Sequence, residues 1–239
     1  AAVTAIEGDS DANNAGDGVN LDSNAGGAIT FTNTAGTSTV HGANGIIADV
    51  SGGDGAINIG QKGATTATAG VGVSANTSGK GQIDVATGAV TATTGGINAN
   101  STAGSVINVK NDGIVSTTGG IGINATSSGA SPGGDVSVDS NANVTGATFG
   151  INATTAGAGA DVKVDASGAA LVQATAGTGI NTSTTLGNIE IDTQAVTGTG
   201  GTGIKAQATA GGGIDINNTG IVTGTAGAGI DAQATGGNG

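Results

Sequence analysis

Residues 96–121 read GINANSTAGSVINVKNDGIVSTTGGI, and a new unit begins immediately with Gly122-Ile123-Asn124-Ala125. The same opening occurs nine times in the 239-residue chain: a glycine, an aliphatic residue, a variable residue and usually alanine. Successive anchor glycines are 24 to 29 residues apart, and a self-similar period in this range is typical of a solenoid of stacked units. The anchor glycines are Gly18, Gly45, Gly72, Gly96, Gly122, Gly150, Gly179, Gly203 and Gly229.

Each unit contains three short apolar segments, of which the anchor is the first. The second segment alternates between apolar and polar residues, as in Ile107-Asn-Val109 and Ile189-Glu-Ile191. The third is shorter and is usually centred on a valine, although residues 63–68 have only alanine and threonine there. Alternation with period two predicts half-buried strands. Three such strands per unit predict an all-β fold, a three-faced parallel β-helix (β-solenoid) of about nine turns.

The repeat covers residues 18–239, so we predict one elongated domain, with residues 1–17 as an N-terminal turn or lead-in. The chain has 50 glycines, no Trp, Tyr, Met or Cys, and only two phenylalanines, Phe31 and Phe149. Its interior is therefore predicted to be narrow and aliphatic. We expect the anchor glycine to turn the chain, while the aliphatic residue and the alanine point inward. Corner insertions such as residues 129–134, which hold the single proline, take up the variation in unit length.

The charge balance limits the kinds of partner. Five Lys+Arg, all of them lysine, against 17 Asp+Glu give a formal net charge of −12. A surface of this sign repels nucleic acid and anionic lipid, because phosphate binding needs clustered lysine or arginine. No apolar run is long enough to span a bilayer, so we predict no membrane insertion of this segment.

Three aspartates, Asp139, Asp165 and Asp192, fall at equivalent places in successive units, immediately after the second strand. Carboxylates stacked about 5 Å apart repel one another unless a cation or a lysine lies between them. Calcium takes oxygen ligands of this kind. We therefore consider a weak calcium site at this column, with a solvated acidic stripe as the alternative. No other cofactor is predicted.

The same carboxylates raise the question of catalysis. Asp139 and Asp165 could form the carboxylate pair that polysaccharide-cleaving enzymes use. The chain nevertheless has no arginine, almost no aromatic residues for sugar stacking, and a single histidine, His41. We predict that the chain is not an enzyme, and a polysaccharide-active β-helix remains the third alternative.

Two polar columns recur on the outward positions of the strands. Stacked asparagines on the first strands can form hydrogen-bonded amide ladders, although Asn124-Ala-Thr126 and Asn152-Ala-Thr154 also fit the glycosylation acceptor pattern. Stacked threonines on the third strands could bind ice, but serine and glutamine interrupt that column. The asparagines are Asn98, Asn124, Asn152 and Asn181, and the threonines are Thr91, Thr145, Thr197 and Thr223.

The position before the anchor glycine is usually polar or small, but three units in the middle of the chain carry Val71, Ile121 and Phe149 there. If these side chains point outward, they form an apolar patch of the sort that marks a contact surface. If they point inward, they fill a corner of the core.

The repeated GINA/GIxA anchor, the I-x-V strand and the closing VTGTAGAGI of residues 222–230 together resemble the passenger domains of bacterial autotransporters. The resemblance covers roughly residues 18–239 and implies a right-handed β-helix that is extracellular, at the bacterial cell surface. It implies a non-enzymatic stalk or adhesin. The partners would be surface molecules of host or neighbouring cells, or further copies of the chain. No catalytic motif of that family can be carried onto these residues.

A self-assembling structural protein is the alternative to the adhesin. Neither terminus has an obvious polar cap, and an uncapped β-helix leaves ladder groups ready to pair end to end into filaments. The chain opens with AAVTAIEG, without methionine, a basic segment or an apolar leader, so we expect a processed or excised segment.

Overall fold

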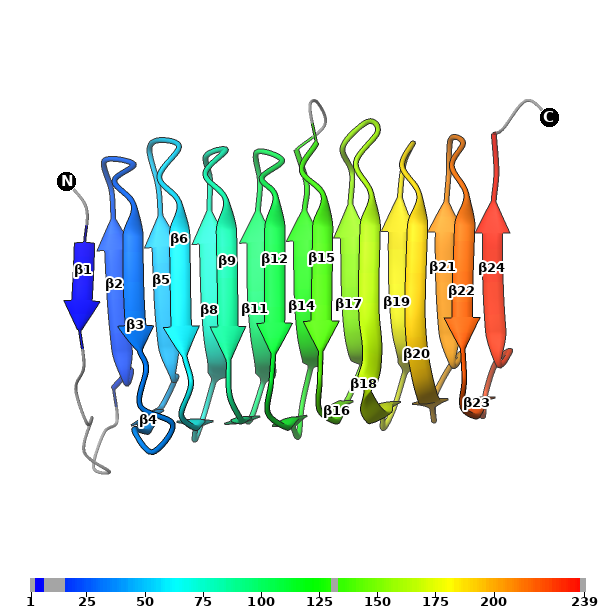
Figure 1. The fold of residues 1–239 in the computed structure, drawn as a ribbon, viewed down its shortest axis with the longest axis horizontal. Helices are drawn as coiled ribbons and strands as arrows, with labels where there is room; N and C mark the ends of the chain where they lie inside the picture. Colours follow the sequence, from blue (N-terminus) through cyan, green and yellow to red (C-terminus); the bar gives the residue numbers. More distant parts are fainter. Residues whose placement is uncertain (1–2, 7–15, 130–132, 237–239) are drawn as a thin grey trace.

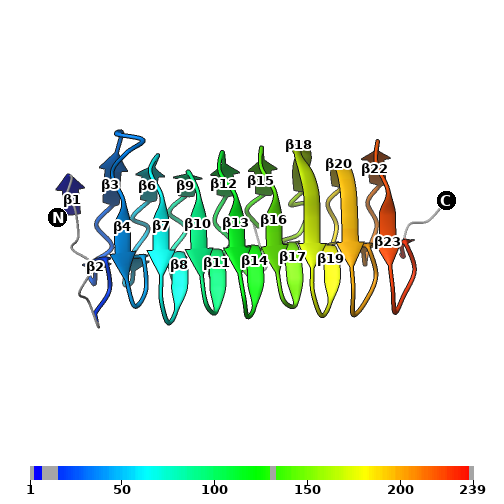
Figure 2. The ribbon, with the colours of Figure 1, turned by 90° about the horizontal axis from the view of Figure 1, so that it is seen from below.

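The computed structural model describes residues 3–6, 16–129 and 133–236 and contains strands, turns and bends, with no helix in those ranges. Parallel strands stack along one axis into a β-solenoid (Figure 1). Each turn places one strand on each of three faces, and the short strands of the third face are seen in front in Figure 2. This arrangement confirms the predicted all-β solenoid.

The faces follow the three apolar segments of each unit. The first face consists of β2 (Val19–Ser23), β5 (Ile46–Val50), β8 (Val71–Thr77), β11 (Gly95–Ser101), β14 (Ile121–Ser127), β17 (Phe149–Thr155), β19 (Thr178–Thr184), β21 (Ile204–Ala208) and β24 (Ile230–Ala234). The second face consists of β1 (Val3–Ile6), β3 (Ile29–Asn33), β6 (Ile57–Gln61), β9 (Ile83–Thr87), β12 (Ile107–Asn111), β15 (Val136–Ser140), the first parts of β18 (Val162–Ala174) and β20 (Ile189–Gly198), and β22 (Ile214–Asn218). The third face consists of β4 (Val40–Gly42), β7 (Thr65–Ala67), β10 (Val90–Ala92), β13 (Val115–Thr117), β16 (Val144–Gly146), the last parts of β18 and β20, and β23 (Val222–Gly224).

The solenoid has about eight turns, close to the predicted nine. The difference lies at the ninth anchor, Gly229, because among the described residues only one strand, β24, follows it. At the other end, β1 pairs with β3, with Val3 opposite Ile29, so part of the predicted lead-in continues the second face. Residues 130–132, which include the proline of the predicted corner insertion, lie outside the described residues.

Two turns depart from the three-strand pattern at the corner between the second and third faces. There β18 and β20 run through the corner as single strands instead of breaking into two. Their pairing shifts register between Ala166 and Leu171, where β18 uses more residues than β20 to reach the next pair. In these two turns the chain therefore passes the corner as a continuous strand. The spacing of apolar residues does not predict this feature.

The core is a continuous aliphatic column inside the solenoid. Isoleucine and valine fill it from all three faces; Val73, Ile83 and Val90, all from the same turn, are 0% exposed. Alanine keeps the side next to the first face thin, as predicted, and Ala99 is fully buried. Each turn buries little apolar surface, so stability depends on stacking against the next turn.

The anchor glycines are explained by the narrow interior, and the prediction that they turn the chain is wrong in the middle turns. Gly72, Gly96, Gly122, Gly150 and Gly179 lie within strands, and no anchor glycine has a positive φ. A Cβ built on Gly96 would lie 2.3 Å from the Gly122 oxygen and 2.4 Å from Val115 Cγ1. Similar contacts, at 2.2 to 2.9 Å, recur from Gly18 to Gly203. In each of these turns the anchor glycine packs against a residue of the third face with no room for a Cβ. The glycine therefore recurs once per turn, and this recurrence is the period of the sequence.

Candidate functional site

The three predicted calcium ligands occupy one ladder of the second face. Asp139 lies opposite Asp165, and Asp165 lies opposite Asp192. Each carboxylate also has a partner of its own: Lys110 Nζ is 3.9 Å from Asp139 Oδ2, and Asn217 Nδ2 donates to Asp192 Oδ1 at 3.2 Å. The register of the acidic column is thus as the spacing indicates, and a lysine and an amide bound it at its two ends.

The middle aspartate is held by a local turn. Asp165 Oδ1 accepts hydrogen bonds from the Ser167 backbone N at 3.0 Å and from Ser167 Oγ at 2.6 Å. These bonds stabilise the carboxylate and lower the pKa of Asp165. In the neighbouring column, Lys163 Nζ donates to Glu190 Oε1 at 2.6 Å, and this bond raises the pKa of Lys163.

A search for three or more His, Cys, Asp or Glu side chains placed to share a metal ion finds no such group within the described ranges. The three aspartates share a ladder without converging on a point. Calcium binding at Asp139, Asp165 and Asp192 stays a prediction.

The outward asparagines of the first face form the amide ladder that the repeat predicts. Asn124 Nδ2 donates to Asn98 Oδ1, Asn152 Nδ2 to Asn124 Oδ1 and Asn181 Nδ2 to Asn152 Oδ1, each at 2.7 Å. The amides of the two sequon-like triplets are therefore engaged in bonds between turns. This ladder ties four successive strands, and in the preceding turns Asn76 Nδ2 donates to Asp49 Oδ1 at 2.7 Å.

Val71, Ile121 and Phe149 share one column beside this ladder. Val71 pairs with Gly95, and Ile121 pairs with Phe149, which in turn pairs with Thr178. The three apolar residues are half-buried, and the choice between an outward patch and a filled corner of the core stays a prediction. Their exposed parts form an interrupted apolar strip on the first face.

The interruption at Gly95 opens a hollow. Val71, Gly95, Ile121 and the ladder residues Asn98 and Asn124 line a depression of about 340 Å³, which we call the first-face notch. A Cβ on Gly95 would meet Val71 Cγ2 at 3.7 Å, an ordinary contact, so the fold does not require glycine there. The notch combines apolar walls with amide groups.

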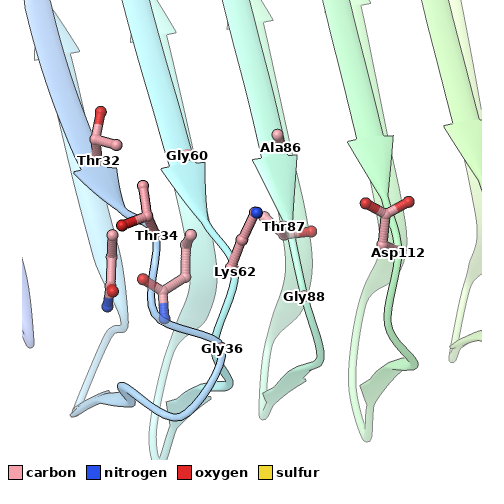
Figure 3. Close-up of a pocket in the computed structure, with 11 residues that line it drawn as sticks. Thr32, Thr34, Gly36, Gly60, Lys62, Ala86, Thr87, Gly88 and Asp112 are labelled. Carbon is pink, nitrogen blue, oxygen red and sulfur yellow. The ribbon is translucent and has the colours of Figure 1, made fainter.

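A larger depression lies on the second face, and the sequence analysis does not predict it. Two adjoining hollows of about 440 and 320 Å³ share Gly60 and Ala86 as lining residues, and we call them together the second-face groove. Figure 3 shows Thr32, Gly60 and Ala86 on successive strands, Asp112 just beyond the end of the next strand, and Lys62 beside them. The groove exists because two consecutive units lack a large outward side chain.

Pairing places the groove floor in the same column as the acidic ladder. Thr32 pairs with Gly60, Gly60 with Ala86 and Ala86 with Lys110, which then pairs with Asp139. The sequence does carry the signal, since the outward position after Ile59 is glycine and the one after Val85 is alanine. Only a comparison of units position by position, with the register known, distinguishes these residues from corner glycine and alanine.

The third face carries the predicted threonine column. Thr91 pairs with Thr66 and Ser116, and Thr145 pairs with Ser116 and Gln173. His41 stands at the start of this column, opposite Thr66. The interruptions lie in register with the threonines, and ice binding by this face stays a prediction.

Comparison with known proteins adds no relative: no family model matches the chain, and neither the curated proteins nor the solved structures contain a significant match. The autotransporter resemblance therefore rests on the sequence motifs alone. Within the described ranges no helix has the length and apolarity that crossing a membrane requires.

Proposed function

We propose that this chain is a non-enzymatic, extracellular β-helix of the bacterial cell surface, an autotransporter-like passenger segment that acts as a stalk or adhesin. Its partners are molecules on host or neighbouring cells, or further copies of the chain. The observation that carries the proposal is a regular solenoid whose outward side chains bond from turn to turn. Such a surface is rigid and repeats along the rod, so it can hold binding groups at fixed positions.

The polar side chains of the surface support this role because many of them form hydrogen bonds with side chains of the neighbouring turn. Asp84, for example, accepts hydrogen bonds from Gln82 Nε2 at 2.8 Å and from Asn108 Nδ2 at 2.8 Å. Asn141 Nδ2 donates to Asp112 Oδ1 at 2.9 Å. Side chains engaged in this way stiffen the rod and hold its outline constant.

The contact surface that we propose is the strip of Val71, Ile121 and Phe149 with the first-face notch between the first two. Apolar groups that stay half-exposed beside a polar ladder are typical of a small docking surface. The notch offers a place for one apolar side chain of a partner, with the Asn98 and Asn124 amides at its rim.

Attachment assays test the proposal. Beads coated with the 239-residue chain are mixed with bacterial and animal cells and, separately, with each other. Ile121→Asn removes the apolar wall of the notch and should lower attachment roughly tenfold, the effect of a central interface residue. Thr145→Asn, at a half-buried outward position of the third face, should leave it unchanged. Antibodies against the chain should label intact source cells.

Absence of attachment in every pairing, or labelling only after cells are made permeable, would refute the proposal. Electron microscopy of the purified chain distinguishes the filament alternative, since filaments many chains long would replace dispersed rods. Turnover of a polysaccharide that Asp139→Asn abolishes would instead establish the enzyme alternative.

A further inference from the structure

The floor of the second-face groove lacks side chains that the fold would allow. A Cβ on Gly60 would meet nothing closer than the Phe31 oxygen at 3.9 Å and Thr32 Cγ2 at 4.0 Å. Glycine within a strand weakens the strand and often marks a place where another molecule approaches the backbone closely. Ala86 continues the gap into the next turn. The missing side chains therefore create space that packing does not demand.

The groove is lined by apolar surface, by uncharged polar groups and by five charged side chains, those of Lys62, Asp84, Lys110, Asp112 and Asp139. Hydroxyls come from Thr32 and Thr34 at one end, and an amide comes from Asn58 beside the floor. The carboxylate of Asp84 is already bonded to Gln82 and Asn108. Groups of this kind recognise a ligand by hydrogen bonds to hydroxyls.

Two lysines line the groove, Lys62 and Lys110, and they differ in their ion pairs. Lys110 Nζ lies between Asp112 at 3.7 Å and Asp139 at 3.9 Å. Lys62, in contrast, makes no ion pair with any residue that the structure describes. Figure 3 shows its side chain extending along the groove toward Thr87. A ligand that fills the groove therefore gains from one carboxylate placed at Lys62.

Two acceptors without a donor lie buried beside the larger hollow. Asn33 and Gln61 line the larger hollow and are 2% and 0% exposed. Within the described structure, Asn33 Oδ1 and Gln61 Oε1 have no hydrogen-bond donor. Gln61 Nε2 is already used, donating to the Ser38 oxygen at 3.2 Å. An acceptor buried without a donor is costly, but these two atoms are enclosed within the solenoid, where a ligand in the groove does not reach them.

We propose that the second-face groove binds a short oligosaccharide that carries a carboxylate, a uronate-type sugar. Gly60 and Ala86 form the floor, the threonines and Asn58 bond its hydroxyls, and Lys62 pairs with its carboxylate. Because the groove has no aromatic side chain for stacking, binding is weak and depends on these polar contacts. The inference does not rest on the proposed function, since a rod that makes its contacts elsewhere would keep this groove.

Titration of the full chain with two probes, tetragalacturonate and the same tetrasaccharide with its carboxyl groups reduced, tests the inference by NMR or calorimetry. The acidic probe should bind up to about fivefold more tightly than the neutral one, the effect of one exposed ion pair. Lys62→Gln should remove that preference, whereas Lys80→Gln should keep it.

Filling the floor gives the sharper test. Gly60→Val should weaken binding of both probes at least tenfold while the melting temperature stays equal or rises. Gly95→Val makes the same change on the first face, where a Cβ also has room, and should bind as the parent does. Undetectable binding of both probes at millimolar concentration, or equal loss in the two valine variants, would overturn the inference.

Discussion

Gly96 and Gly60 occupy strands two turns apart and have opposite reasons for being glycine. The interior position of Gly96 leaves no room for a methyl group, because a Cβ would lie 2.3 Å from a backbone oxygen. The outward position of Gly60 leaves ample room, with the nearest atom 3.9 Å away. The first glycine is required by the fold, and the second opens a groove. In a glycine-rich solenoid, the regular glycines therefore indicate architecture and the irregular ones indicate surface sites.

The strongest test of this comparison uses two neighbouring residues. Gly96→Ala forces a methyl group against the Gly122 oxygen and Val115, so we expect a loss of about 3 kcal/mol or more in the free energy of unfolding, the upper range for overpacking. Gly95→Ala adds the same methyl outward and should change stability by less than about 0.5 kcal/mol. Urea unfolding followed by circular dichroism measures both. Equal effects at the two positions would contradict the steric explanation.

The residue that faces an anchor glycine provides the second test. Thr65 takes the place of valine in the third-face column, is 1% exposed, and its Oγ1 has no partner in the described structure. Thr65→Val replaces a buried, unsatisfied hydroxyl by a methyl group of similar volume. We expect a gain of about 1 to 2 kcal/mol in the free energy of unfolding. Thr91→Val, outward and exposed on the next strand, is the control and should have little effect. A destabilised Thr65→Val would indicate that the hydroxyl has a bonded partner such as water.

A smaller effect is expected at the groove floor itself. Gly60→Val adds a β-branched side chain at a position that accepts it. The free energy of unfolding should therefore increase by about 0.5 to 1 kcal/mol. Thermal unfolding, monitored beside the parent chain, measures the gain. Destabilisation by 1 kcal/mol or more would mean that Gly60 is structural after all, and the contrast with Gly96 would fail.

The smallest effect concerns the acidic column next to the groove. Ser167→Ala removes the side-chain hydrogen bond to Asp165, so the pKa of Asp165 should rise toward its ordinary value of 3.8. A carboxyl whose pKa is lowered on folding stabilises the protein above its unfolded pKa and loses that contribution as pH falls through its folded pKa. The variant should therefore be less stable by about 0.5 kcal/mol near pH 7, and this difference should disappear as the pH falls below the lowered pKa of Asp165. A difference that does not change with pH would show that the serine acts through packing alone.

The sequence predicts the architecture well because the constraints that produce it are local and repeated. Alternating segments such as Ile107-Asn-Val109 specify an inward and an outward side for each strand, and the period specifies stacking. The register follows from the anchors, which is why Asp139, Asp165 and Asp192 were placed in one ladder correctly. The asparagine ladder from Asn98 to Asn181 was predictable for the same reason.

The remainder could not be predicted because it depends on distances across the interior and between faces. The role of the anchor glycine follows from its separation from Val115, a residue of another strand. The half-buried state of Phe149 depends on how far the corner opens. The groove at Gly60 depends on the absence of a side chain. Glycine is so frequent in this chain that one glycine at an outward strand position is not distinctive in the sequence.

One measurement tests the central claim most directly: the free energies of unfolding of Gly96→Ala and Gly60→Ala, determined side by side with the parent chain. Both variants add one methyl group to a glycine of a β-strand, so propensity contributes equally to each. If interior space dictates the first glycine and not the second, Gly60→Ala should be as stable as the parent or slightly more stable, and Gly96→Ala should lie about 3 kcal/mol or more below it. Two variants of equal stability, or a less stable Gly60→Ala, would contradict the account.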